Sequence, residues 1–130
     1  MITKTALLKK TPVLFANTAD QVYAEFQDYD SKDNAKLPKH LKLLYADYTY
    51  EDYSGDAYVL GYNKEKKQFF EVHGSHCSCY GLEGQWDEEY YDDWKTLSIC
   101  IRKRLDTGAE WYSRYANSSS ELKAFLEVSE

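Results

Sequence analysis

Four side chains that commonly ligate metals or act as nucleophiles lie within seven residues of one another: His73, His76, Cys77 and Cys79. Zinc takes thiolate and imidazole ligands in a tetrahedron, and structural sites usually draw two ligand pairs from separate segments. On an extended backbone His73, Cys77 and Cys79 would share one face and His76 would face away. The rest of the chain offers no second pair. These four residues are metal candidates, but we expect no cofactor and interpret the cluster as buried thiols beside a histidine bonded to backbone.

A cysteine nucleophile is the second chemistry that this cluster could provide. An activated thiolate needs a nearby base or cation, and His76 directly precedes Cys77. Adjacent residues of an extended strand point to opposite faces, so the pair is poorly placed for proton transfer. We therefore expect no catalytic residues and no enzymatic activity. A small metalloprotein or thiol enzyme built on residues 73–79 remains an alternative.

Acidic residues gather in two windows that contain no lysine or arginine, one between Lys42 and Lys64 and the other at residues 83–93. Tyrosines are interleaved with the acids in both. Carboxylates can stand in for phosphates and steer a basic partner, while tyrosines supply anchoring area. The sequence thus predicts an acidic, tyrosine-rich surface for a host protein with a basic groove. Its expected partner-binding residues are Asp47, Glu51, Asp52, Asp56, Glu83, Asp87, Glu88, Glu89, Asp92, Asp93, Tyr90 and Tyr91.

Four of these acids also allow a different interpretation. Glu88, Glu89, Asp92 and Asp93 have the spacing of one helical face. Such a face could hold a hydrated cation or perform acid–base chemistry. A run of carboxylates is more often simply solvated, and this one lies close to the expected start of a helix.

Composition narrows the function classes further. The 130 residues, 43% of them hydrophobic, fit a single domain over residues 1–130. A net charge of −6 argues against direct nucleic-acid binding and against adsorption to anionic membranes. Three cysteines form a poor disulfide framework, and no apolar run reaches the length of a membrane span. We expect a cytoplasmic protein without a signal peptide.

Hydrophobic spacing predicts how the chain positions these residues. We expect a short strand or arm on either side of Pro12, followed by a helix from Thr18 to about residue 29, capped by Thr18 and Gln21. Alternating residues between 41 and 73 predict three strands joined by short turns. A stripe of large apolar residues predicts a helix from about residue 92 to 107, and Ser118 and its neighbours should cap a last helix.

The expected fold is therefore α+β: a three-stranded antiparallel meander packed by an N-terminal helix and two C-terminal helices. Residues 74–86, GSHCSCYGLEGQW, should carry the chain off the third strand. We expect this segment to bury Cys77, Cys79 and Trp86 against the sheet and to turn at Gly81 and Gly84.

Residues 53–89 resemble a signature found in small uncharacterised proteins of bacteriophages and of bacterial genomes that carry phage genes. In those proteins a strand pair of the form YSG…VL runs into GSHCSCYGLEGQW and then into an acidic W-x-P-E turn. This chain departs from that turn at Asp87 and Glu88. The resemblance implies a phage context and, by association with other small acidic phage proteins, an inhibitor of host defence of the anti-CRISPR or anti-restriction type acting in the host cytoplasm. A virion structural or assembly protein is a further alternative.

Overall fold

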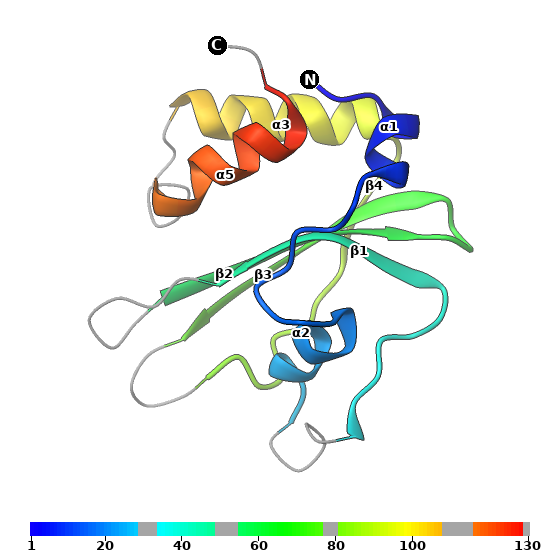
Figure 1. The fold of residues 1–130 in the computed structure, drawn as a ribbon, viewed down its shortest axis with the longest axis vertical. Coiled ribbons are helices and arrows are strands. Elements are labelled where there is room, and N and C mark those ends of the chain that lie inside the picture. Colours follow the sequence, from blue (N-terminus) through cyan, green and yellow to red (C-terminus); the bar gives the residue numbers. More distant parts are fainter. Residues whose placement is uncertain (29–33, 49–54, 77–80, 108–115, 129–130) are drawn as a thin grey trace.

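An antiparallel sheet forms the centre of the molecule. A computed structural model describes residues 1–28, 34–48, 55–76, 81–107 and 116–128. Strands β1 (Leu41–Tyr48), β2 (Gly55–Asn63) and β3 (Gln68–His76) form a meander, which the short β4 (Glu89–Tyr91) extends in the order β1-β2-β3-β4 (Figure 1). The predicted α+β class and the meander are confirmed, and β4 is a strand that the sequence analysis missed.

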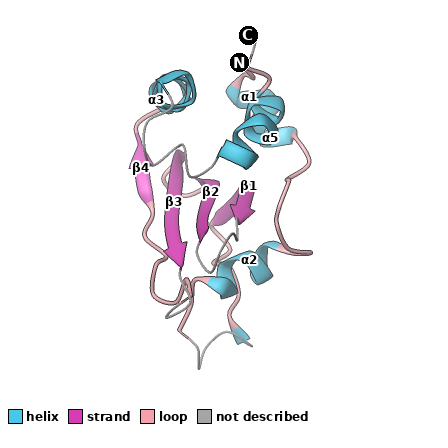
Figure 2. Cartoon of the chain, turned by 90° about the vertical axis from the view of Figure 1, so that its left-hand side faces the viewer, coloured by secondary structure: helices cyan, strands magenta, loops and turns pink. Residues whose placement is uncertain are grey.

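Helices cover both faces of this sheet. Successive side chains of a strand point to opposite faces, so Leu60 packs in one core cluster with Leu97, and Val59 packs in the other with Val22. Helices α1 (Lys4–Lys9), α3 (Trp94–Thr107) and α5 (Ala116–Leu126) lie on the first face, and α2 (Ala19–Glu25) lies on the second (Figures 1 and 2). We call these the three-helix face and the α2 face.

The cap of α2 matches the prediction. The Gln21 backbone N–H donates to Thr18 Oγ1 at 3.1 Å, and the Thr18 N–H donates to Gln21 Oε1 at 3.1 Å, which completes a capping box. The helix is shorter than expected, however, since it ends at Glu25 rather than near residue 29. The Phe26 N–H donates to Tyr23 O at 3.1 Å, so the last turn tightens and the helix stops there.

The segment before Pro12 was predicted incorrectly. It forms the helix α1, which begins where the Ala6 N–H donates to Thr3 Oγ1 at 3.3 Å, and it buries Leu7 completely. After Pro12 the chain is extended, as expected. Val13 pairs in parallel with the β1 edge, where the Ala46 N–H donates to Val13 O at 2.9 Å.

The two long C-terminal helices confirm the predicted apolar stripes. Trp94, Leu97 and Ile101 are buried on α3, and Phe125 and Leu126 are buried on α5. Helix α5 begins two residues before Ser118, so residues 118–120 lie inside the helix and are not its caps. Among the described residues, no helix has both the length and the apolar character needed to cross a membrane.

The segment between β3 and β4 is described from residue 81 onward. The expected turn at Gly84 is confirmed by a φ of +76°, and the Gly84 N–H donates to Phe26 O at 2.9 Å. Trp86 is half-buried between α2 and the sheet, with its ring centroid 5.3 Å from Phe26 and 6.1 Å from Phe70. Cys77 and Cys79 lie outside the described residues.

Candidate functional site

The carboxylate of Glu71 on β3 is fully buried, on the side of the sheet that α1, α3 and α5 cover. Tyr58 Oη donates to Glu71 Oε2 at 2.5 Å, and Tyr91 Oη donates to Oε1 at 2.7 Å. Arg104 Nη1 also donates to Oε1, at 2.9 Å, and His73 Nε2 lies 3.7 Å from the same oxygen. The partners come from β2, β3, β4 and α3, so this Glu71 network joins four elements.

The network keeps Glu71 ionised. Burial alone would raise the pKa of its carboxyl, but the contacts from His73 and Tyr58 and the charge of Arg104 outweigh burial and lower the pKa to about 2. A buried charge is tolerated when it is paired and its lone pairs accept hydrogen bonds. Glu71 meets both conditions. Its side chain is inaccessible, and its contacts link β2, β4 and α3 to β3.

Tyr91 carries this network to the edge of the sheet. Its hydroxyl donates to Glu71 and accepts from Arg104 Nη2 at 3.2 Å. Burial and the neighbouring Glu71 carboxylate raise the pKa of Tyr91 to about 12. The hydroxyl therefore stays protonated and fixed, and the half-buried ring has one orientation on the edge strand β4.

The acidic residues 87–93 lie along β4 and its two flanks, not on a helix. The hypothesis that Glu88, Glu89, Asp92 and Asp93 share one helical face is therefore wrong, because Glu89–Tyr91 pair with residues 69–71 of β3. In a strand the side chains alternate. Glu89 is exposed on the three-helix face as the Cα partner of Glu71, and its neighbour Tyr90 packs on the α2 face.

Tyr90 is held by different partners from those of Tyr91. Asn63 Nδ2 donates to the Tyr90 hydroxyl at 2.9 Å, and that hydroxyl donates to Glu88 Oε1. Burial first, and then the Glu88 carboxylate, raise the pKa of Tyr90. Lys66 Nζ lies 4.2 Å from the ring centroid, so the β2–β3 turn brings a base to a window that contains none in the sequence.

The flanks of β4 place further carboxylates at the surface. Asp87, Asp92 and Asp93 are all exposed. The Thr96 N–H donates to Asp93 Oδ1 at 2.7 Å, which caps the start of α3, and this bond lowers the pKa of Asp93. Asp93 thus has a structural role, whereas Asp87, Glu89 and Asp92 form the exposed acidic part of the edge. Glu83 is half-buried in the segment that leads to it.

The first acidic window lies elsewhere. Asp47 is on β1 and Asp56 is on β2, both half-buried, and Glu51 and Asp52 fall outside the described residues. Asp47 Oδ2 is buried and has no hydrogen-bond partner within the described part of the chain. Three strand spacings, about 14 Å, separate β1 from β4. Among the described residues, the acids of the two windows therefore do not form one continuous edge.

The His/Cys candidates are described only in part. The His73 ring is half-buried and packs 5.3 Å from the Tyr58 ring, beside the Glu71 carboxylate. His76 ends β3, while Cys77 and Cys79 lie beyond the described residues. Among the residues that are described, no three His, Cys, Asp or Glu side chains are arranged to hold a metal ion.

Sequence reasoning missed Glu71, although the sequence contains a signal for it. In QFFEVH, Phe69, Glu71 and His73 alternate on one strand face, and a charge at such an inward position must have a partner. No protein-family model, curated protein or solved structure matches the chain. The resemblance to small phage proteins therefore stays a prediction, and the geometry of the edge is the basis for a functional proposal.

Proposed function

We propose that this protein binds a basic surface of a partner protein through the β4 edge. A single observation carries the proposal: exposed carboxylates flank two tyrosines on β4, one on each face of the sheet, whose hydroxyls are held by hydrogen bonds. Tyr91 is held by Glu71 and Arg104, and Tyr90 by Asn63 and Glu88. Rigid rings lose little conformational entropy when a partner packs on them, which suits them as anchors.

The charge of this edge determines which partners it favours. The exposed side chains of Asp87, Glu89 and Asp92 lie on a molecule whose net charge is −6. Carboxylates arranged in this way accelerate encounter with a basic groove and disfavour acidic partners. A short charged edge strand also resists pairing with strands of other proteins. The contacts we propose are therefore made by side chains rather than by sheet extension.

The class of partner follows from the same chemistry. Basic grooves of this kind are typical of proteins that handle nucleic acids, because such grooves hold phosphates. The carboxylates of β4 would occupy phosphate positions there. Together with the phage-like signature at residues 53–89, this supports a non-catalytic inhibitor of a host nuclease or other defence protein, acting in the host cytoplasm.

The test uses a triple variant, Asp87→Asn, Glu89→Gln and Asp92→Asn, which neutralises the exposed edge and leaves the α3 cap intact. Its binding to purified restriction endonucleases and CRISPR effector nucleases is measured by titration at increasing salt, alongside inhibition of DNA cleavage. We expect the parent protein to bind at least one of them with strong salt dependence, and the triple variant to lose both binding and that dependence.

A matched control separates the edge from the overall charge. It neutralises three exposed acids away from β4: Glu25, Glu121 and Glu127. This control changes the net charge by the same amount, so the proposal requires it to bind like the parent. Equal losses in the two triple variants would show that net charge matters and the edge does not.

A further inference from the structure

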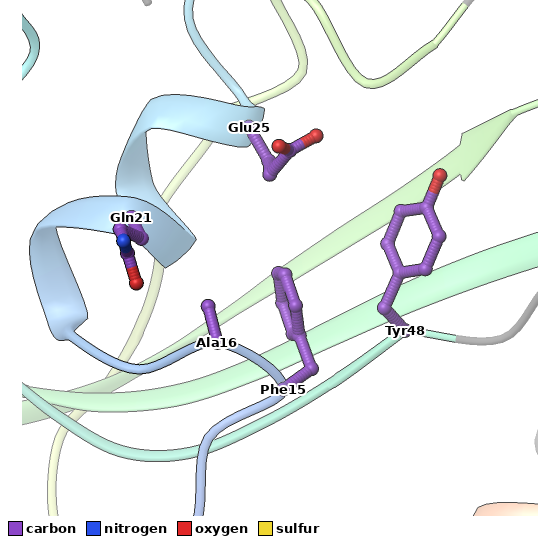
Figure 3. A pocket seen from close by; sticks show the side chains of 5 residues that line it. All are labelled: Phe15, Ala16, Gln21, Glu25 and Tyr48. Atoms are coloured by element: carbon purple, nitrogen blue, oxygen red, sulfur yellow. The ribbon is translucent and has the colours of Figure 1, made fainter. Parts of the chain in front are cut away.

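A pocket of about 430 Å³ opens on the α2 face, between α2 and the end of β1. Phe15 and Ala16 enter it from the segment after the Val13 bridge, Tyr48 from the end of β1, and Gln21 and Glu25 from α2 (Figure 3). The volume is in the range of small-molecule sites. The pocket adjoins the β1 edge, whereas the acidic surface follows β4 at the opposite edge of the sheet.

Two aromatic rings form one wall of this pocket. The Phe15 and Tyr48 ring centroids lie 5.4 Å apart at an interplanar angle of 41°, and both rings are half-buried. Figure 3 shows the rings standing side by side, with the Glu25 side chain extending from the end of α2 toward Tyr48. Aromatic faces carry partial negative charge and attract cations placed over them.

The carboxylate of Glu25 adds a full negative charge to the same space. Glu25 is the last residue of α2, whose final turn contains no basic residue, so its charge lies at the negative end of the helix dipole. An acid at this position is locally unfavourable to the helix.

We propose that this pocket binds the head group of an organic cation, an ammonium or a guanidinium, against the Phe15 and Tyr48 rings with Glu25 as its counter-ion. Two rings and one carboxylate suit a large, weakly hydrated cation. They do not suit Mg²⁺ or Ca²⁺, which require several oxygen ligands. The site stands independently of the partner-binding edge, since no residue is common to the two.

The first experiment titrates two cations against their neutral isosteres. Choline is compared with 3,3-dimethylbutanol, and an acetylated arginine tripeptide with its citrulline counterpart. The NMR signals of the Phe15 and Tyr48 rings report binding. Ligand is added up to about 10 mM, which covers the dissociation constants expected for head groups of this size. We expect the charged member of each pair to bind at least about tenfold more tightly than the neutral one.

The comparison between cations identifies the source of the ligand. Tighter binding of choline supports a free small molecule, and tighter binding of the arginine tripeptide supports a side chain of another protein. Both results agree with a cation pocket. Ring signals that do not move with any cation, or equal binding of charged and neutral members, would overturn the proposal.

Variants test the assigned groups separately. Tyr48→Leu should weaken choline binding roughly 2- to 30-fold, while Tyr48→Phe, which keeps the ring, should bind like the parent. Glu25→Gln should weaken choline binding, because it removes the counter-ion charge from the pocket. Glu65→Gln is the charge-matched control. If it weakens binding as much as Glu25→Gln does, the pocket is not the binding site.

Discussion

Replacing Glu71 by Gln tests whether the buried network holds β4 and α3 against the sheet. Glutamine has the shape of glutamate and retains one acceptor oxygen for Tyr91 and Arg104. The Tyr58 hydroxyl can rotate to accept a hydrogen bond from the new amide. What the variant removes is the negative charge that compensates Arg104, whose Nη1 lies 2.9 Å from Glu71 Oε1.

The expected loss follows from the pKa of Glu71. Its carboxyl has a pKa of about 2 in the folded protein against a reference value of 4.5, which corresponds to about 3 kcal/mol of stability at neutral pH. A small domain has only about 5–15 kcal/mol in total. Glu71→Gln should therefore fold at pH 7 and unfold at a clearly lower urea concentration than the parent.

The dependence on pH distinguishes this charge effect from ordinary loss of packing. Because the folded pKa lies below the unfolded one, the contribution of Glu71 is complete above pH 4.5 and disappears as the pH falls toward 2. At about pH 3 it should amount to about 1.4 kcal/mol. The parent and Glu71→Gln should therefore converge in acid, where the protonated carboxyl of the parent resembles the amide of the variant.

Urea unfolding followed by tryptophan fluorescence, at about pH 7 and at about pH 3, measures the difference in stability between the parent and Glu71→Gln. The matched control is Glu89→Gln, which removes the same charge from the residue paired with Glu71 on β4 but at an exposed position. The control should be nearly as stable as the parent. A loss that is equal at both pH values, or equal in the two variants, would refute the assigned role of the network.

Two further predictions concern local structure. Thr18→Ala removes the cap of α2 and should cost about 1 kcal/mol in urea unfolding, whereas Thr18→Ser should retain most of the stability. Gly61→Ala would place a methyl group 2.3 Å from Phe70 Cζ, within a buried core, and should lower the free energy of unfolding by about 1–3 kcal/mol. Parent-like stability of Gly61→Ala would contradict the close packing of that ring.

The parts of the fold that sequence predicts well are those set by local pattern. The α2 capping box needs only Thr18 and Gln21, three residues apart, and the α3 stripe needs only helical periodicity. Alternation of apolar and polar residues predicted the meander, but the side chains of β1 do not alternate throughout. The pairing with β2 shifts between Leu43 and Tyr45, and Leu44 and Tyr45 both pack on the three-helix face. A bulge of this kind arises from pairing with the neighbouring strand, which local alternation does not record.

The candidate site was predicted in composition but not in arrangement. The acids around Tyr90 have helical spacing as well as strand spacing, and only pairing with Phe70 of β3 decides between them. Three residues are too few for a recognisable strand pattern. Lys66 and Arg104 reach the acidic window from other elements, so a stretch without bases in the sequence is not without bases in space.

The two edges of the sheet are closed in different ways, and the difference bears on how a partner can approach. Val13 occupies the backbone groups of β1 at Leu44 and Ala46. At the other edge of the sheet, Gln85 lies just before β4 and bonds both backbone groups of Ser75. The Ser75 N–H donates to Gln85 Oε1 at 2.8 Å, and Gln85 Nε2 donates to Ser75 O at 2.7 Å. The edge of β3 is thus occupied by a side chain at Ser75, beyond the residues that β4 covers. A partner that meets this side of the molecule encounters carboxylates and fixed tyrosine rings, so its binding should weaken steeply with salt, as strand addition would not.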